Sequence, residues 1–175
     1  MSKYPILYQA SVLCAVAGCS VVTFRAWRNR NGLFPECEGG TGWNRFSWSD
    51  IATARAVVVL TERGLNAQTA VDAAMRARPM FQKIILSLEQ DCMDVDTIMV
   101  IDPAQRRVGA TVRIMRRQTS LMEVFDDLES EASIIVDGFA IVAHVWEKLK
   151  HYSRRETVNT LARALAGALD PGRME

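Results

Sequence analysis

Arginine side chains gather in the first third of the chain, at a spacing that could recognise phosphate or base edges. Arg25, Arg28 and Arg30 stand close together, and Arg45 follows a glycine-rich loop. The planar guanidinium group pairs with two acceptors at once, so it can bind a phosphate group or the edge of a base. Apolar residues are interspersed with the cations between positions 21 and 30. This pattern favours nucleic-acid binding, although a solvated cationic helix face would look the same.

Two predicted helices would position these arginines. Residues 9–17 form an apolar run of helical length, and the turn Gly18-Cys19-Ser20 separates it from the basic segment 21–30. Gly18 can adopt the left-handed conformation of a helix C-cap, and Ser20 is a good N-cap. A helix, a short turn and a basic helix predict a helix-turn-helix, whose second helix enters the DNA major groove. The loop that follows fits a β-hairpin wing.

Taken in order, these blocks resemble the winged-helix head of the MerR (mercury-resistance regulator) family. The resemblance covers about the first 75 residues, and Ala26 and Asn44 depart from the family pattern. It implies that helix two contacts bases and phosphates, and that the wing steadies the complex on the backbone. The matching blocks are Gly18-Cys19-Ser20, Thr23-Phe24-Arg25-Ala26-Trp27-Arg28, Gly32-Leu33-Phe34-Pro35 and Gly42-Trp43-Asn44-Arg45-Phe46-Ser47, followed by Asp50.

We predict DNA contacts from the second helix, its cap and the wing. In the wing, Arg45 would reach the backbone or the minor groove, and Trp43 would either pack at the groove edge or fill the core. The predicted DNA-binding residues are Ser20, Thr23, Arg25, Arg28, Arg30, Trp43 and Arg45.

Charge is distributed unevenly along the 175 residues. Residues 1–78 hold nine basic against five acidic residues, whereas residues 79–175 hold twelve against fifteen. This asymmetry suits a DNA-facing part followed by a part that avoids phosphates. We therefore predict an α+β protein with two domains. Residues 1–78, the head, form a winged helix-turn-helix; residues 79–175, the body, form a small α/β dimerisation, effector or partner-binding domain with a C-terminal helix.

Two more helices are expected to support the head. One spans residues 51–63 and is capped by Ser49 or Asp50, and the next is capped by Asn66. Pro79 predicts a break or kink. Residues 81–88 carry a short apolar stripe, which fits a dimer seam or burial against the protein's own body.

The body alternates strand and helix signals. Strands are predicted at 97–101 and 108–114, and a capped helix at 120–130. Residues 133–136 lead into Asp137-Gly138, a strong hairpin signal, although a helix from Phe139 fits nearly as well. The last predicted helix, which carries an apolar stripe from 158 to 169, suits subunit pairing or docking on its own domain.

No pattern in the chain predicts catalysis, a metal or another cofactor. The four cysteines lack paired zinc-type spacing, and His144 and His151 stand too far apart to chelate one ion comfortably. Neither a phosphate loop nor a nucleophile with a convincing base is present. Val16-Ala17-Gly18-Cys19 resembles a lipoprotein cleavage site, but a single preceding lysine and an interrupted apolar run make it weak.

The leading hypothesis is a sequence-specific regulator of transcription, not an enzyme, that binds double-stranded DNA as a homodimer on an inverted repeat. RNA polymerase or another protein would be a further partner. We expect a cytoplasmic, nucleoid-associated protein with no membrane partner. The alternatives are an excision or architectural factor of a mobile element, and a protein-interaction module that has lost DNA reading.

Overall fold

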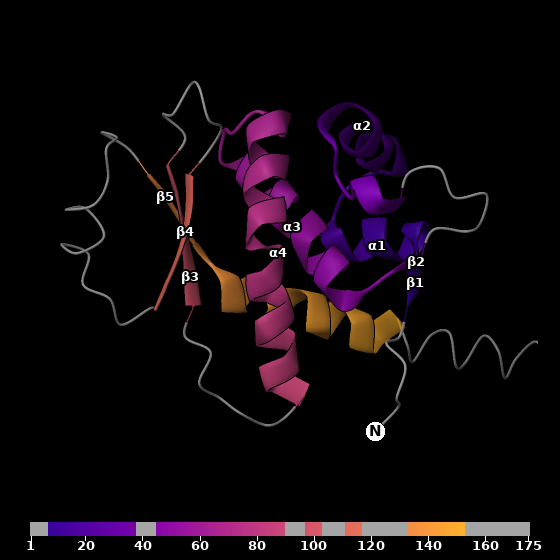
Figure 1. The fold of residues 1–175 in the computed structure, drawn as a ribbon. Helices are drawn as coiled ribbons and strands as arrows, with labels where there is room; N and C mark the ends of the chain where they lie inside the picture. Colours follow the sequence, from indigo (N-terminus) through magenta and orange to yellow (C-terminus); the bar gives the residue numbers. More distant parts are fainter. Residues whose placement is uncertain (1–6, 38–44, 90–96, 103–110, 117–132, 153–175) are drawn as a thin grey trace, which may run out of the picture.

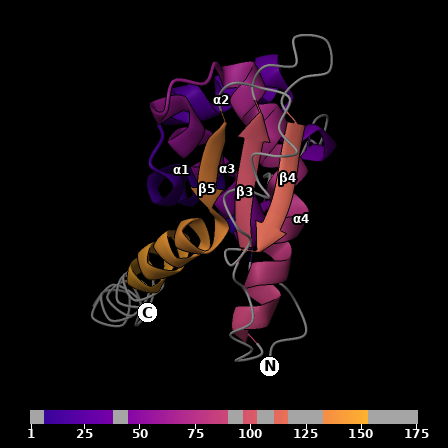
Figure 2. The same ribbon diagram turned by 90° about the vertical axis from the view of Figure 1, so that its left-hand side faces the viewer.

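The computed structural model describes residues 7–37, 45–89, 97–102, 111–116 and 133–152 (Figure 1). Two packed helices, α3 (Trp48–Glu62) and α4 (Ala67–Glu89), lie between the remaining helices of the head and a three-stranded sheet (Figures 1 and 2). The fold is α+β, as predicted. The predicted helix at 120–130, the loop segment with Trp43, and the terminal stripe at 158–169 fall outside the described residues.

The helix-turn-helix forms where the sequence predicts it. Helix α1 (Ala10–Ala17) ends at Gly18, whose φ of 86° is the left-handed conformation that glycine adopts without strain. Helix α2 (Val21–Asn31) begins at Ser20, whose hydroxyl accepts a hydrogen bond from the Thr23 amide at 3.0 Å. The two helix axes differ in direction by 102°. This angle lies within the range of about 90–120° found in helix-turn-helix units.

A short two-stranded sheet joins the start of the head to the end of the wing segment. Strand β1 (Tyr8–Gln9) pairs antiparallel with β2 (Arg45–Phe46), so that Tyr8 lies opposite Phe46. The Phe46 ring packs with Phe24 of α2 and with Phe34, which precedes the 3-10 turn η1 (Pro35–Cys37). The three ring centroids lie 5.5–6.3 Å apart. These rings fix α2 to the base of the wing segment.

Helix α3 (Trp48–Glu62) begins earlier than predicted. Its N-cap is Ser47 and not Ser49 or Asp50, because Ser47 and Asp50 form a reciprocal capping box. The Asp50 amide donates to the Ser47 hydroxyl at 3.3 Å, and the Ser47 amide donates to the Asp50 carboxylate at 2.7 Å.

Helix α4 (Ala67–Glu89) continues through Pro79, so the predicted break is wrong, and the alternative of a kink stays a prediction. Its predicted cap is confirmed, since the Thr69 amide donates to the Asn66 side chain at 2.9 Å. A proline inside a helix removes one backbone hydrogen bond and costs about 3 kcal/mol. Residues on both sides of Pro79 are buried, including Ala77 and Phe81. Their burial offsets this cost and keeps the helix continuous.

The body contains an antiparallel sheet in the order β4-β3-β5. Strands β3 (Thr97–Asp102) and β4 (Thr111–Arg116) confirm the predicted strand pair, with Val100 opposite Arg113. On the other side of β3 lies β5 (Ile134–Asp137). Met99 and Ile101 of β3 belong to the main core, so one face of the sheet packs toward the helices.

A helix, not a second hairpin strand, follows β5. It spans 138–152 within the described part of the chain. The Asp137 carboxylate accepts a hydrogen bond from the Ala140 amide at 3.1 Å and so caps this helix. A Cβ atom on Gly138 would lie 2.7 Å from Met80 Cε and 3.2 Å from the Thr97 carbonyl oxygen. The glycine therefore permits close packing of this helix, and the predicted hairpin is wrong.

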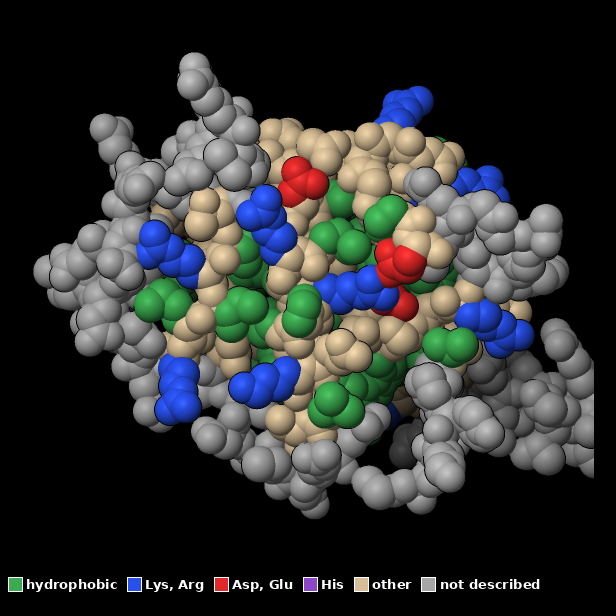
Figure 3. All heavy atoms as spheres, in the orientation of Figure 1, with side chains coloured by type: hydrophobic (Ala, Val, Ile, Leu, Met, Phe, Trp, Pro, Cys, Tyr) green, Lys and Arg blue, Asp and Glu red, His purple; other side chains and the backbone are tan. Residues whose placement is uncertain are grey.

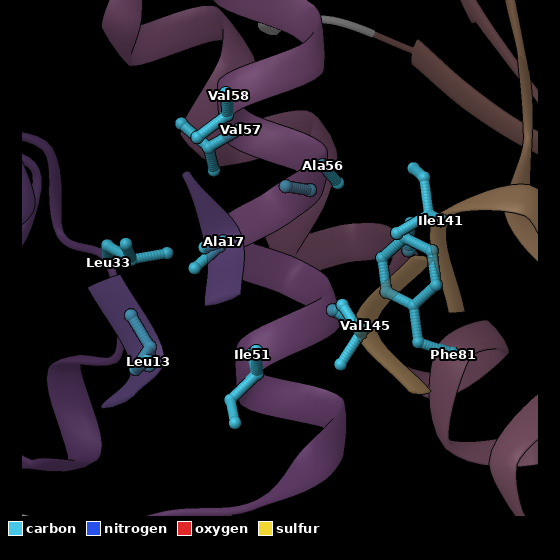
Figure 4. Close-up of a cluster of buried hydrophobic side chains, with 14 of the residues drawn as sticks. Leu13, Ala17, Leu33, Ile51, Ala56, Val57, Val58, Phe81, Ile141 and Val145 are labelled. Atoms are coloured by element: carbon cyan, nitrogen blue, oxygen red, sulfur yellow. The ribbon is translucent and has the colours of Figure 1, made fainter. Parts of the chain in front are cut away.

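One apolar core extends from the head into the body. Figure 4 shows Leu13 of α1, Ile51 of α3, Phe81 of α4 and Val145 of the 138–152 helix around it. Trp146 on that last helix also packs edge-on against Trp48, with ring centroids 4.5 Å apart. The predicted boundary at 78/79 falls inside α4. The division into two domains stays a prediction.

Candidate nucleic-acid interface

Helix α2 has one buried face and one exposed polar face. Phe24 and Trp27 are buried, whereas Arg25, Asn29 and Arg30 are exposed. The helical period of 3.6 residues produces this separation. Of the predicted DNA-binding residues, Arg25 and Arg30 thus lie at the surface of the helix.

The N-terminal end of α2 is also exposed, and it is largely apolar. Val22 is 76% exposed and Val21 is 41% exposed. Ser20 and Thr23 share a hydrogen bond of 2.8 Å between their hydroxyl oxygens. These two hydroxyls therefore stabilise the helix start while remaining at its surface.

Arg28 occupies a different position from Arg25 and Arg30. Its side chain is half-buried, and its guanidinium carbon lies 6.0 Å from the Phe24 ring centroid and 5.9 Å from that of Phe46. At this distance the cation is attracted to the electron-rich ring faces. Arg28 thus links α2 to the base of the wing segment.

Arg45 on β2 is exposed and lies opposite Gln9 of β1. Trp43 lies outside the described residues. The chain contains no acidic residue before Glu36. The helix-turn-helix itself therefore carries positive charge without neighbouring carboxylates of its own sequence.

Two sets of contacts hold the C-terminal end of α2. The side-chain amide of Asn31 donates to the Gln68 side-chain oxygen at 3.1 Å, which ties α2 to α4. Gly32 then takes φ 70°, and the Leu33 amide donates to the Trp27 carbonyl oxygen at 3.1 Å. Together with the phenylalanine rings, these contacts orient the exposed face of α2.

Arg78 joins three parts of the head, and sequence reasoning missed it. One guanidinium nitrogen pairs with Glu36, and the other lies 2.6 Å from Asp50 Oδ1. The guanidinium carbon also lies 5.4 Å from the Phe34 ring centroid. In the sequence, only Asp50 pointed to such an ion pair, because a carboxylate that becomes buried needs a cation beside it. The partner could not be identified without knowing that α4 passes beside α3.

The same contacts shift two pKa values. Partial burial opposes the charge on Glu36, but hydrogen bonds from its own backbone and from Arg78 outweigh it and lower the pKa. Burial likewise opposes the charge on Arg78, yet Glu36 and Asp50 raise its pKa. Both groups therefore remain charged at neutral pH. The pair of Arg78 with Glu36 holds α4 to η1, and its pair with Asp50 holds α4 to the N-terminal end of α3.

The face of the molecule occupied by α4 differs from the exposed face of α2 in its distribution of side chains. In Figure 3 basic side chains, and a few acidic ones, are scattered over it among apolar and neutral side chains. Leu86 of α4 is 50% exposed. The dispersed charges of this face contrast with the polar face of α2.

Two cysteines of the head, Cys14 and Cys19, are poorly suited to bind a metal. Burial raises the pKa of Cys14, and burial together with the neighbouring Cys14 raises that of Cys19 to about 12. Metals bind the thiolate form. Within the described ranges, no three His, Cys, Asp or Glu side chains are placed to hold a metal ion.

These elements define a helix-turn-helix of the DNA-binding kind, with its second helix exposed. Residues 8–74 match the family model described as MerR HTH family regulatory protein. The head is therefore a MerR-type helix-turn-helix domain, as predicted, and the match points to a DNA-binding regulator of transcription rather than an enzyme. A comparison with curated proteins finds no match.

In the part of the chain that the structure describes, no single helix is long and apolar enough to cross a membrane. Helices α1 and α2 reach the required length and apolar composition only when taken together.

Proposed function

We propose that this protein binds a specific site in double-stranded DNA and regulates transcription from it. The carrying observation is the exposed face of α2, which presents Arg25, Asn29 and Arg30 while the opposite face is fixed in the core. Asparagine and arginine are suited to contact base edges and phosphates. A DNA-binding regulator would work in the cytoplasm, at the nucleoid.

Each predicted site residue has a place in this proposal. Arg25 contacts base edges in the major groove, whereas Arg30 and Arg45 bind phosphates. Ser20 and Thr23 lie at the start of α2, where a helix N-terminus favours phosphate. Arg28 supports α2 from behind, through its contacts with the phenylalanine rings. Trp43 is proposed to pack at the groove edge or in the core of the head.

One helix-turn-helix contacts few bases, so a homodimer on an inverted repeat is the proposed binding unit. The body supplies the pairing surface or the contact with RNA polymerase or another protein. Sedimentation of the protein with and without DNA would give the stoichiometry, and one protomer per site would contradict the dimer.

The proposal is tested with a duplex selected from a random library by the full chain. Arg25→Ala should weaken binding to that duplex by about 5- to 150-fold, the equivalent of about 1–3 kcal/mol for a bidentate base contact. Lys83→Ala, which removes an exposed cation of α4 outside the head, is the matched control. Equal affinities of the two variants would refute the assignment of α2. Failure of the full chain to select any duplex would favour a protein-interaction module.

A further inference from the structure

A pocket lies where the head meets the body, between α3, β5 and the 138–152 helix. Its volume is about 660 Å³. Pockets that bind small molecules measure about 300–1,000 Å³ and are mostly apolar, with a few polar groups that orient the ligand. Val59, Ile134, Val136 and Ile141 provide the apolar lining here.

The polar groups of this pocket favour an anion. Arg55 and Arg63 of α3 provide positive charge, and His144 of the 138–152 helix provides a neutral ring. The one acidic side chain among the described lining residues is Asp137, and its carboxylate already caps the helix through the Ala140 amide. The balance of charge in the lining is therefore positive.

A buried hydroxyl supports the same conclusion. Ser133 lines the pocket, and its hydroxyl oxygen is buried with no hydrogen-bond partner among the residues that the structure describes. A buried polar group without a partner is costly. A ligand oxygen would supply that partner.

Two pocket residues also contact the end of α1. The Arg55 guanidinium donates to the Ala17 carbonyl oxygen at 3.2 Å, and the His144 ring donates to the Val16 carbonyl oxygen. The last carbonyl groups of a helix lack partners within the helix and carry partial negative charge. Both contacts lie directly before Gly18, where the chain turns toward α2.

We propose that this pocket binds a small organic acid, a carboxylate on an apolar body, and that the bound acid controls DNA binding through the turn before α2. Arg63 and Arg55 hold the carboxylate, since guanidinium groups pair with carboxylates in a bidentate manner. The carboxylate competes with the Ala17 carbonyl oxygen for Arg55. The turn between α1 and α2 then loses a support, and the affinity for DNA falls.

The control of DNA binding rests on the proposed function, whereas the acid site does not. The first measurement therefore uses no DNA. The full chain is titrated calorimetrically with 4-phenylbutyrate, benzoate and octanoate, and with the uncharged amide of each acid. We expect saturable binding of at least one acid at one site per chain, and at least tenfold weaker binding of its amide.

Arg63→Gln is the main variant, because the Arg63 side chain is exposed and its replacement leaves the contacts with α1 in place. It should weaken acid binding at least tenfold with an unchanged melting temperature, whereas Lys83→Ala should leave binding unchanged. If no acid of the panel saturates, or if the amides bind equally well, the site is refuted.

The second measurement repeats the DNA titration at a saturating concentration of the bound acid. DNA affinity should fall by about 5- to 150-fold, the usual size of coupling between two sites, and DNA should weaken acid binding by the same factor. Arg63→Gln should remove this effect at the same acid concentration. Unchanged DNA affinity with the acid bound would refute the coupling, and a protein that binds the acid but no DNA would refute only the proposed function.

Discussion

Arg78 is the residue whose loss should most disturb the head. Its side chain is 30% exposed, while that of its partner Asp50 is only 9% exposed. Arg78→Ala leaves the Asp50 carboxylate buried without its cation. We expect the free energy of unfolding to fall by about 2–3 kcal/mol, less than for a fully buried pair because water screens part of the interaction.

Chemical denaturation of the variant and the parent protein would measure this change. Lys83→Ala, another cation of α4 but an exposed one, should change the stability by less than about 0.5 kcal/mol. Equal effects of the two substitutions would show that Arg78 does not hold α4 to α3.

His144 should make the stability depend on pH. Burial lowers its pKa from 6.5, and the charges of Arg55 and Lys148 lower it further, against the hydrogen bond to the Val16 carbonyl oxygen. The folded protein therefore favours the neutral ring. Its contribution to stability is complete above pH 6.5 and is lost as the pH falls through the lower pKa of the folded state.

Unfolding experiments between pH 5 and pH 7.5 would test this dependence. His144→Gln should reduce the loss of stability toward acid pH, whereas replacing the exposed His151 by Gln should not. An unchanged pH dependence in His144→Gln would contradict the role of burial at this position.

Among the elements, the 138–152 helix depends on the close approach of Gly138 to Met80 and to the backbone of Thr97. A Cβ atom at Gly138 would meet both Met80 and the backbone oxygen of Thr97, and that backbone cannot move independently of β3. Gly138→Ala should therefore destabilise the protein by about 1–3 kcal/mol, the usual cost of overpacking.

A double-mutant cycle with Met80→Ala would separate crowding from other causes. If crowding by Met80 is the cause, Gly138→Ala should cost less in the Met80→Ala background than in the parent protein. Strictly additive effects would contradict the packing described for this helix.

The elements that could be predicted from sequence are those with local signals. Gly18, Ser20 and Asn66 determine helix ends through contacts with residues a few positions away, so their roles were visible in the sequence. Asp137-Gly138 was misleading, because the same dipeptide occurs in hairpin turns and at the start of helices. Here Asp137 caps a helix. The outcome depended on Met80 and β3, which no local pattern reveals.

The candidate nucleic-acid interface also has a part that could be predicted from sequence and a part that could not. The sequence predicted Arg25, Arg28 and Arg30 as DNA-contacting residues of the second helix. Arg25 and Arg30 are exposed, whereas Arg28 is half-buried. The stacking of Arg28 on Phe46 and the approach of Arg55 to Ala17 join segments distant in sequence. Periodicity cannot supply such contacts, because they depend on tertiary packing.

At the scale of the whole molecule, the core does not stop at the predicted boundary. Phe81 and Ile84 of α4 and Val145 of the 138–152 helix belong to the same cluster as Leu13 of the head. We therefore expect a single cooperative unfolding transition of the full chain. Calorimetry should give equal calorimetric and van't Hoff enthalpies. Two separated transitions would instead indicate two independently folding domains.

A salt series tests most directly whether the exposed face of α2 binds specific DNA. Affinity of the full chain is measured for the selected duplex and for a scrambled duplex across salt concentrations. We predict a preference for the selected duplex at every salt concentration and affinity that falls steeply as salt rises, since bound phosphates release counterions. Arg30→Ala should reduce that slope by about one. Equal affinity for both duplexes at every salt concentration would contradict the account.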